Sequence, residues 1–177
     1  IIHAMGGRRL IQAVTSSPAT LEGNRATFLL MNETQHWDHS NAGFDMADVI
    51  ERNITKSPDG AARTLRITNA PDPSKESVGL ADRDAWEEVE AGTTVPTGLL
   101  YDSLEAPDDA PLTAEAAPAV VESIRGDSHW LHPERIVLSI LDSRNPPSRS
   151  RRWWFNQVWA REDAWCVPAV FKARARP

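Results

Sequence analysis

The pattern of hydrophobic and polar positions divides the chain into expected strands and expected helices. Apolar side chains alternate with polar ones, or run together, in short segments that predict strands at residues 9–15, 27–31, 63–68 and 95–101. They recur every three or four positions in longer segments that predict helices at residues 41–57, 76–90, 113–125, 133–141 and 146–159. A loop rich in turn-forming residues is expected at residues 16–25.

The order of these segments predicts an α/β fold. Strands and helices alternate through the first part of the chain and only helices follow, which indicates a sheet-containing part with a helical appendage. The segment 27–31 is an unbroken apolar run, which is typical of a parallel-sheet strand buried on both faces. We therefore expect a sheet-containing domain at residues 1–105 and a helical region at residues 106–177.

Composition limits the class of protein. The chain has 177 residues, of which 41% are hydrophobic and 25% are charged, as in an ordinary globular protein. No apolar run reaches the roughly 18 residues that a membrane span needs, so we expect no membrane contact. The single cysteine, Cys166, excludes an internal disulfide and fits a reducing compartment. Because the chain opens on Ile1 without an initiator methionine, we expect it to be a piece of a longer protein.

The net charge of −6 is an average over three unlike blocks. Residues 1–71 carry seven basic and seven acidic side chains, residues 72–143 carry four and sixteen, and residues 144–177 carry eight and two. The acidic block is typical of a solvated surface. In the basic block, Trp153, Trp154, Phe155 and Trp159 lie among arginines. Such aromatics can stack on nucleic-acid bases, but their spacing favours the buried face of an amphipathic helix.

Candidate chemistry begins where the apolar run 27–31 ends, at Asn32 and Glu33. The carboxyl edge of an open α/β sheet is where ligands bind, so this strand would present a carboxylate there. A nucleoside triphosphatase needs such a group to orient the attacking water, which Glu33 can do, and often has an adjacent acid on the magnesium side. Asn32 occupies the position of this adjacent acid. It can accept a hydrogen bond from a magnesium-bound water but brings no charge.

The next expected strand ends in Thr68 and Asn69, 35 residues after Glu33. A polar pair at a neighbouring strand end can contact the γ-phosphate or its water and report hydrolysis to the rest of the fold. The same residues also fit an ordinary strand-to-helix turn, because Pro71, Asp72 and Pro73 follow them.

Further motifs follow one another in order along the chain. They occupy residues 13–18, 21–25, 28–37, 53–57, 98–103, 126–130 and 152–165. In this order they resemble the ATPase core of phage terminase large subunits, most closely those from actinobacterial phages and prophages. The resemblance implies the partial parallel sheet of a P-loop ATPase with flanking helices, followed by a helical linker. In this family, the strand ending at Glu33 is the Walker B strand and the pair Thr68-Asn69 corresponds to the coupling motif.

The resemblance also implies an activity and partners. Terminase large subunits use ATP and Mg²⁺ to move double-stranded DNA into procapsids, and a nuclease domain cuts the DNA. They act in the host cytoplasm, transiently at the procapsid, with the portal protein, a small subunit and further copies in a ring. By this resemblance Glu33 orients the lytic water, Asn32 supports magnesium through water, and Thr68 and Asn69 couple hydrolysis to movement.

Two family features are missing from these 177 residues. No G-x-x-x-x-G-K-[ST] phosphate loop occurs, and Gly6-Gly7-Arg8-Arg9 lacks its spacing and lysine. No strand bearing the nuclease's first aspartate occurs near the end of the chain. We therefore expect an internal fragment that does not hydrolyse ATP efficiently by itself.

Alternatives remain at this stage. A helicase-like P-loop ATPase would have a similar Walker B strand, and a prophage remnant or interaction module would keep the fold without activity. Arg25 and Arg63 are candidates to stabilise phosphoryl charge, within one subunit or between two. His36 and His39 have a metal-ligand spacing but no evident third ligand, and a loop or helix-start cluster is favoured.

Overall fold

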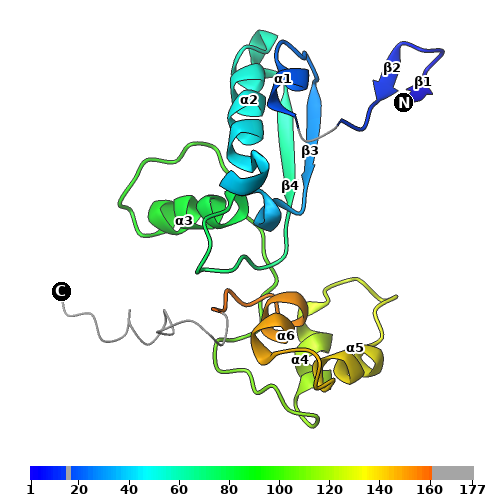
Figure 1. Ribbon diagram of the computed structural model, residues 1–177, viewed down its shortest axis with the longest axis vertical. Coiled ribbons are helices and arrows are strands. Elements are labelled where there is room, and N and C mark those ends of the chain that lie inside the picture. Colours follow the sequence, from blue (N-terminus) through cyan, green and yellow to red (C-terminus); the bar gives the residue numbers. More distant parts are fainter. Residues whose placement is uncertain (15–16, 161–177) are drawn as a thin grey trace.

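The computed structural model describes residues 1–14 and 17–160, which form small two-stranded sheets and short helices (Figure 1). The strands are β1 (Ile2–Ala4), β2 (Arg9–Ile11), β3 (Phe28–Asn32) and β4 (Arg63–Ile67). The α-helices are α1 (Pro18–Leu21), α2 (Gly43–Thr55), α3 (Val78–Glu90), α4 (Ala117–Ile124), α5 (Pro133–Ile140) and α6 (Pro147–Trp154). Short 3₁₀ helices are η1 (Thr34–His36), η2 (His39–Asn41) and η3 (Pro58–Gly60). The mixed α/β class is confirmed, whereas the full parallel sheet of a P-loop ATPase stays a prediction.

The strands β3 and β4 pair in parallel and are joined by the crossover helix α2. Leu30 lies opposite Leu65 and Asn32 lies opposite Ile67, so the two strand ends meet at one edge. The covered face of this sheet packs against α2 through a cluster centred on Met31, which is 1% exposed. The other buried members of this cluster are Leu21, Met46, Ala47, Val49, Ile50 and Val78.

The opposite face of the β3–β4 sheet is bare. Phe28 and Leu30 on β3, together with Leu65 and Ile67 on β4, are exposed large hydrophobic side chains. The expectation of a strand buried on both faces is therefore wrong for residues 27–31. In the part of the chain that the structure describes, α2 covers one face and no further layer covers the other, so alternate side chains of the apolar run remain in solvent.

The strand predicted at residues 95–101 does not form. Pro96 removes a ladder hydrogen bond and Gly98 adopts a left-handed backbone with φ of 87°, and both oppose a regular strand. The segment instead contacts α3 at its end, where Tyr101 stacks on Trp86 with ring centroids 4.8 Å apart. Arg83 on α3 pairs with Glu105, just after this segment, and also with Glu87 on its own helix.

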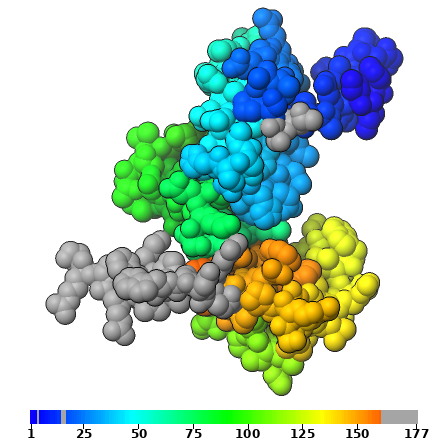
Figure 2. Space-filling model, in the orientation of Figure 1, coloured from blue at the N-terminus to red at the C-terminus, as the bar shows by residue number. Residues whose placement is uncertain are grey.

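The first residues form a hairpin rather than a strand of the main sheet. The prediction of a strand at residues 9–15 holds for β2, which pairs antiparallel with β1 through Ile2 and Ile11. Figures 1 and 2 show this hairpin set apart from the β3–β4 sheet. The loop predicted at residues 16–25 contains the short helix α1, whose Leu21 is buried beneath α2.

The helical part has its own core around Phe155, which is fully buried. Its other buried members are Ala106, Ala110, Ala117, Val121, Ile136, Val137 and Ile140. Helix α4 begins at Ala117 rather than at residue 113, because Pro118 is accommodated only in a first helical turn.

Helix α6 ends at Trp154 rather than at residue 159, and the aromatic residues at its end differ in burial. Phe155 and Trp154 pack into the core, but Trp153 is 48% exposed, so the idea of one buried aromatic face is wrong. The physical reason is that successive residues of an α-helix lie about 100° apart, so the adjacent Trp153 and Trp154 cannot share one face. Beyond the helix, Asn156 takes a left-handed backbone with φ of 50°. Within residues 1–14 and 17–160, no helix has both the length and the apolarity to cross a membrane.

Candidate functional site

The candidate site lies where β3 and β4 end. Glu33 follows the last residue of β3 in a left-handed conformation, with φ of 58° and ψ of 47°. A non-glycine residue in this region costs about 1–3 kcal/mol, and such strain persists where the surroundings over-determine it. The backbone reverses at this residue into η1, and the Glu33 side chain is half-buried at the carboxyl edge of the sheet.

A hydrogen-bond chain joins Glu33 to the end of β4 through Gln35. The Gln35 side-chain amide donates to Glu33 Oε2 at 2.5 Å, and its Oε1 accepts from the Thr68 hydroxyl at 2.7 Å. The backbone N–H of Gln35 donates in turn to Thr68 Oγ1 at 3.1 Å. The glutamine amide is thus fixed at both ends, and it holds the carboxylate in one orientation.

Helix α3 closes over this chain at Gly79. A Cβ atom built on Gly79 would lie 2.9 Å from Gln35 N and 3.0 Å from Thr68 Oγ1, so glycine allows the helix to approach this closely. The start of α3 is fixed by Ser77, whose hydroxyl accepts from Leu80 N at 3.2 Å, and by Val78, whose N–H donates to the Trp37 carbonyl at 2.9 Å. The polar chain is therefore packed on one side by a helix.

The structure keeps Asn32 and Asn69 outside this hydrogen-bond chain. Both residues are exposed at the strand ends, and Asn32 alternates onto the bare face with Leu30. Their backbone carbonyls have partners nearby: Trp37 Nε1 donates to Asn32 O at 3.1 Å, and Asn69 O lies 2.8 Å from Thr68 Oγ1. Of the predicted residues, Glu33 and Thr68 are brought together, whereas the amide side chains of Asn32 and Asn69 face solvent.

A partly buried ionic cluster ties the sheet to two helices. Arg66 on β4 pairs with Glu51 on α2 and with Asp82 on α3, so one guanidinium ties both helices to the strand. Burial raises the pKa of the Asp82 carboxyl above its ordinary value, although the charge of Arg66 opposes this shift. This arginine was not among the sequence candidates, and its contacts indicate a structural role.

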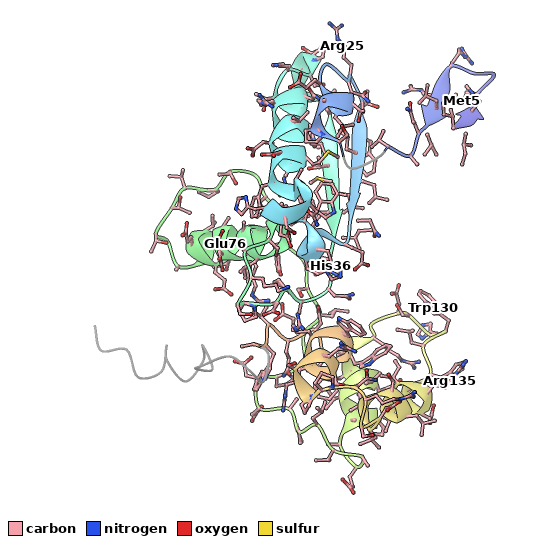
Figure 3. The ribbon with its side chains drawn as sticks, in the orientation of Figure 1. Met5, Arg25, His36, Glu76, Trp130 and Arg135 are labelled. Carbon is pink, nitrogen blue, oxygen red and sulfur yellow. The ribbon has the colours of Figure 1, made fainter. Side chains whose placement is uncertain are left out.

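The two arginine candidates lie at the other end of the strands. Arg25 precedes β3 and is labelled far from His36, which follows the site, in Figure 3. Arg63 begins β4 and donates to the backbone carbonyls of Gly60 and Ala62. Neither arginine therefore reaches Glu33 within the same chain; a contribution between subunits stays a prediction.

The histidine residues lie in the 3₁₀ segments after Glu33. His36 ends η1, and His39 begins η2, where it stacks on Phe44 with ring centroids 4.3 Å apart and pairs with Glu76 at 3.4 Å. No group of three potential ligands occurs among the described residues.

Two further residues from the sequence analysis are Trp130, at the end of the motif at residues 126–130, and Cys166. Trp130 is 73% exposed and points outward in Figure 3. It lies in the connection between α4 and α5. Cys166 lies outside the described residues.

The chemistry of the donors fits an oriented water better than a protein-built metal cage. One carboxylate, Glu33, stands at the edge, and magnesium in nucleotide sites is held largely by phosphates and water with one or two carboxylates. Asn32 is free to hydrogen-bond a metal-bound water, because its side chain is exposed. A triphosphate cradle does not fit the residues present, since the chain contains no phosphate-loop motif.

A large hollow lies between β4 and the helical part and is distinct from Glu33. Its volume is about 1530 Å³, and its lining includes Thr68, Pro71, Tyr101, Trp153 and Asn156. Thr68 thus stands between the Glu33 chain on one side and this hollow on the other.

Gln35 and Gly79 were missed by reasoning from the sequence. Gln35 carried a signal, because a polar side chain two residues after the candidate carboxylate can turn back to it. Gly79 carried little signal, since its importance depends on how closely α3 approaches η1 in space.

The chain is similar to proteins of mycobacterial phages. It is 44% identical over 188 aligned positions to the Gene 13 protein of Mycobacterium phage L5, and 43% identical over 188 positions to the Gene 13 protein of Mycobacterium phage D29. Each alignment covers 95% of this chain and 31% of the relative, so the chain spans about a third of the length of these curated relatives. No family model and no solved structure matches the chain. The expected phage origin is therefore supported.

Proposed function

We propose that this chain is part of a phage terminase large subunit, the ATP-driven motor that packages viral DNA. The observation that carries the proposal is the hydrogen-bond chain from Glu33 through Gln35 to Thr68. It joins the two strand ends at which the sequence places the lytic carboxylate and the coupling residue. The similarity to phage proteins supports the same class, although the name Gene 13 protein states no activity.

In this proposal Glu33 accepts a hydrogen bond from the attacking water and orients it toward the γ-phosphate. Gln35 holds the carboxylate so that one oxygen, Oε1, remains available while Oε2 accepts from the glutamine amide. Magnesium, when bound with ATP, would neutralise phosphate charge, and Asn32 would contact a water of its shell.

Thr68 gives the proposal a route for coupling. Its hydroxyl bonds both the amide N–H and the side chain of Gln35, so a change in the Glu33 contacts alters the contacts at the end of β4. Asn69 extends this end toward solvent. The partners in this proposal are double-stranded DNA, a portal protein, a small subunit and further copies of the chain in a ring. The motor would act at the procapsid portal in the host cytoplasm.

The experiment needs a protein that supplies the phosphate loop. A chimera in which this chain replaces the matching segment of the Gene 13 protein of phage L5 provides a longer context. In that chimera Glu33→Gln is expected to retain ATP binding while the hydrolysis rate falls about 10²–10⁴-fold, the usual contribution of a positioned general base. Binding is measured with a fluorescent nucleotide and hydrolysis by phosphate release.

Glu22→Gln is the matched control, because Glu22 is an exposed glutamate before β3, away from the carboxyl edge. It should leave both quantities unchanged. Undiminished hydrolysis in Glu33→Gln would remove Glu33 from the role proposed here. A helicase-like ATPase would show the same response to Glu33→Gln, but it would lack packaging of DNA into procapsids.

The rival proposal is a non-catalytic interaction module. It is favoured by Asn32, which brings no charge to the magnesium side, and by the absence of a phosphate-loop motif from the sequence. A chimera that neither binds nor hydrolyses ATP, while a wild-type phage L5 protein does both, would favour this module over an ATPase.

A further inference from the structure

A contact between the helical part and the turn after Thr68 has no place in the function described so far. Arg152 on α6 faces Asp72 in the turn between β4 and α3, with Nη1 3.4 Å from Oδ2. The side chains are only 15% and 7% exposed, respectively. Figure 1 shows α6 directly beneath this turn. Removing one partner of a buried pair leaves the other charge uncompensated, so the pair constrains both elements.

The turn that carries Asp72 is held by hydrogen bonds of its own. Asp72 Oδ1 accepts from Ser74 N at 3.1 Å and from Ser74 Oγ at 2.6 Å, and the backbone N–H of Lys75 donates to Asp72 O at 3.0 Å. Prolines flank the aspartate, and Pro71 is fully buried. Only three residues separate Asp72 from Thr68, so the turn leads directly from the Arg152 contact to the candidate site.

The helical end of the contact is held as firmly. The carbonyl of Phe155, one turn beyond Arg152, accepts from Ala106 N at 2.9 Å, and Gln157 donates to the Pro107 carbonyl at 2.5 Å. Asn156 donates to Ser103 Oγ at 3.1 Å. The segment after α6 is therefore clamped to residues 103–107, and Arg152 projects from a fixed base.

The distance within the pair leaves room for adjustment. Charge-assisted N–H···O contacts are usually about 2.7–2.9 Å, whereas this pair stands at 3.4 Å. Arg152 Nε is buried and has no hydrogen-bond partner among the described residues.

We propose that Arg152 is a positioning residue for the candidate site: through Asp72 it fixes the turn that carries Thr68, and so ties the Glu33–Gln35–Thr68 chain to the helical part. The link to hydrolysis rests on the proposed function, whereas the positional effect does not. Arg152 acts through Asp72 and makes no contact with Glu33 or Gln35 in the described structure.

The test measures amide hydrogen exchange in the 177-residue chain. The Gln35 N–H, which donates to Thr68 Oγ1, reports the site, and the Ile50 N–H within α2 reports the sheet domain as a whole. In Arg152→Ala we expect exchange at Gln35 to rise about tenfold with little change at Ile50. Asp72→Asn should have the same effect, and Arg152→Lys should restore most of the protection.

Arg149→Ala is the matched control, because Arg149 is exposed on the same helix and stacks over Trp153 at 5.1 Å, away from Asp72. It should leave Gln35 unchanged. An Arg152→Ala chain in which Gln35 exchange stays as in the parent, or rises equally with Ile50, would overturn the proposal, since the role would then be absent or merely structural. If Arg152→Ala fails to fold, exchange at Gln35 relative to Ile50 is compared between Asp72→Asn and Arg152→Lys, with the same outcomes expected as above.

The exchange result separates this inference from the proposed function, because it needs neither ATP nor activity. In the chimera, the same proposal predicts that Arg152→Ala lowers the turnover number with little change in nucleotide affinity. A chimera without ATPase activity would overturn the proposed function. The positioning role of Arg152 would still be tested by the exchange at Gln35 relative to Ile50.

Discussion

At the scale of single residues, the site depends on backbone conformations and close approaches. Glu33 has a left-handed backbone, and the carboxylate is aimed by Gln35 rather than by a direct bond to Thr68. The type and place of Glu33 and Thr68 could be predicted, because an apolar strand ending in a polar residue presents it at the sheet edge. The backbone reversal at Glu33 could not, since glutamate has no preference for that conformation.

Gly79 allows a direct test of this packing. Replacing glycine by alanine in a helix usually stabilises a protein by about 0.5–1 kcal/mol. Here the new methyl would press on Gln35 N and Thr68 Oγ1, and overpacking of this kind costs about 1–3 kcal/mol. We expect Gly79→Ala to lower the free energy of unfolding, measured by urea titration. An alanine variant that is more stable than the parent would show that α3 does not approach η1 this closely.

The turn between α5 and α6 gives a prediction on pH. Hydrogen bonds from the Arg144 guanidinium and backbone lower the pKa of the half-buried Asp142 to about 2. A carboxyl whose folded pKa is depressed stabilises the fold above its ordinary value of 3.8, and this contribution is lost as the pH falls from there toward 2. Asp142→Asn should therefore lower stability at neutral pH and have a much smaller effect near pH 2.

Urea unfolding at both pH values, with Asp109→Asn as the control in an exposed loop, measures this difference. An equal effect of Asp142→Asn at both pH values would contradict the depressed pKa.

At the scale of elements, periodicity located most helices and two of the main strands but could not give their surroundings. The positions of α2, α3 and α5 follow the predicted segments within a few residues, because their apolar faces are regular. The segment 95–101 shows the limit: its apolar residues suggested a strand, yet Pro96 and Gly98 prevent a ladder and Tyr101 packs on Trp86. The run 27–31 shows another limit, since an apolar strand does not reveal whether a second layer covers it.

The two faces of β3 predict opposite responses to mutation. Leu30 is on the bare face and is 58% exposed, so Leu30→Thr should change the free energy of unfolding by less than about 0.5 kcal/mol. Met31 points into the cluster with Met46 and Ile50, and Met31→Ala should cost about 2–5 kcal/mol. Urea titrations of both variants measure the contrast. A loss of 2 kcal/mol or more in Leu30→Thr would show that this face is covered in solution.

At the scale of the whole molecule, the sequence indicated a class that the structure and the comparisons support in part. A phage origin and a mixed α/β fold agree with the expectation, while the ATPase motor remains our proposal. The alignments cover 31% of each relative, and this sequence contains no phosphate-loop motif. The Asp72–Arg152 contact could not be predicted, because the partners are 80 positions apart in the sequence and only the folded arrangement joins them.

The most direct test of the central claim is a single-turnover measurement on the chimera with the L5 Gene 13 protein. ATP is bound first, hydrolysis is then started by adding Mg²⁺, and the rate of the chemical step is compared between parent and Glu33→Gln. We expect that bound ATP persists in Glu33→Gln, with a rate about 10²–10⁴-fold lower than in the parent. Equal rates in the two proteins would contradict the claim that Glu33 orients the lytic water.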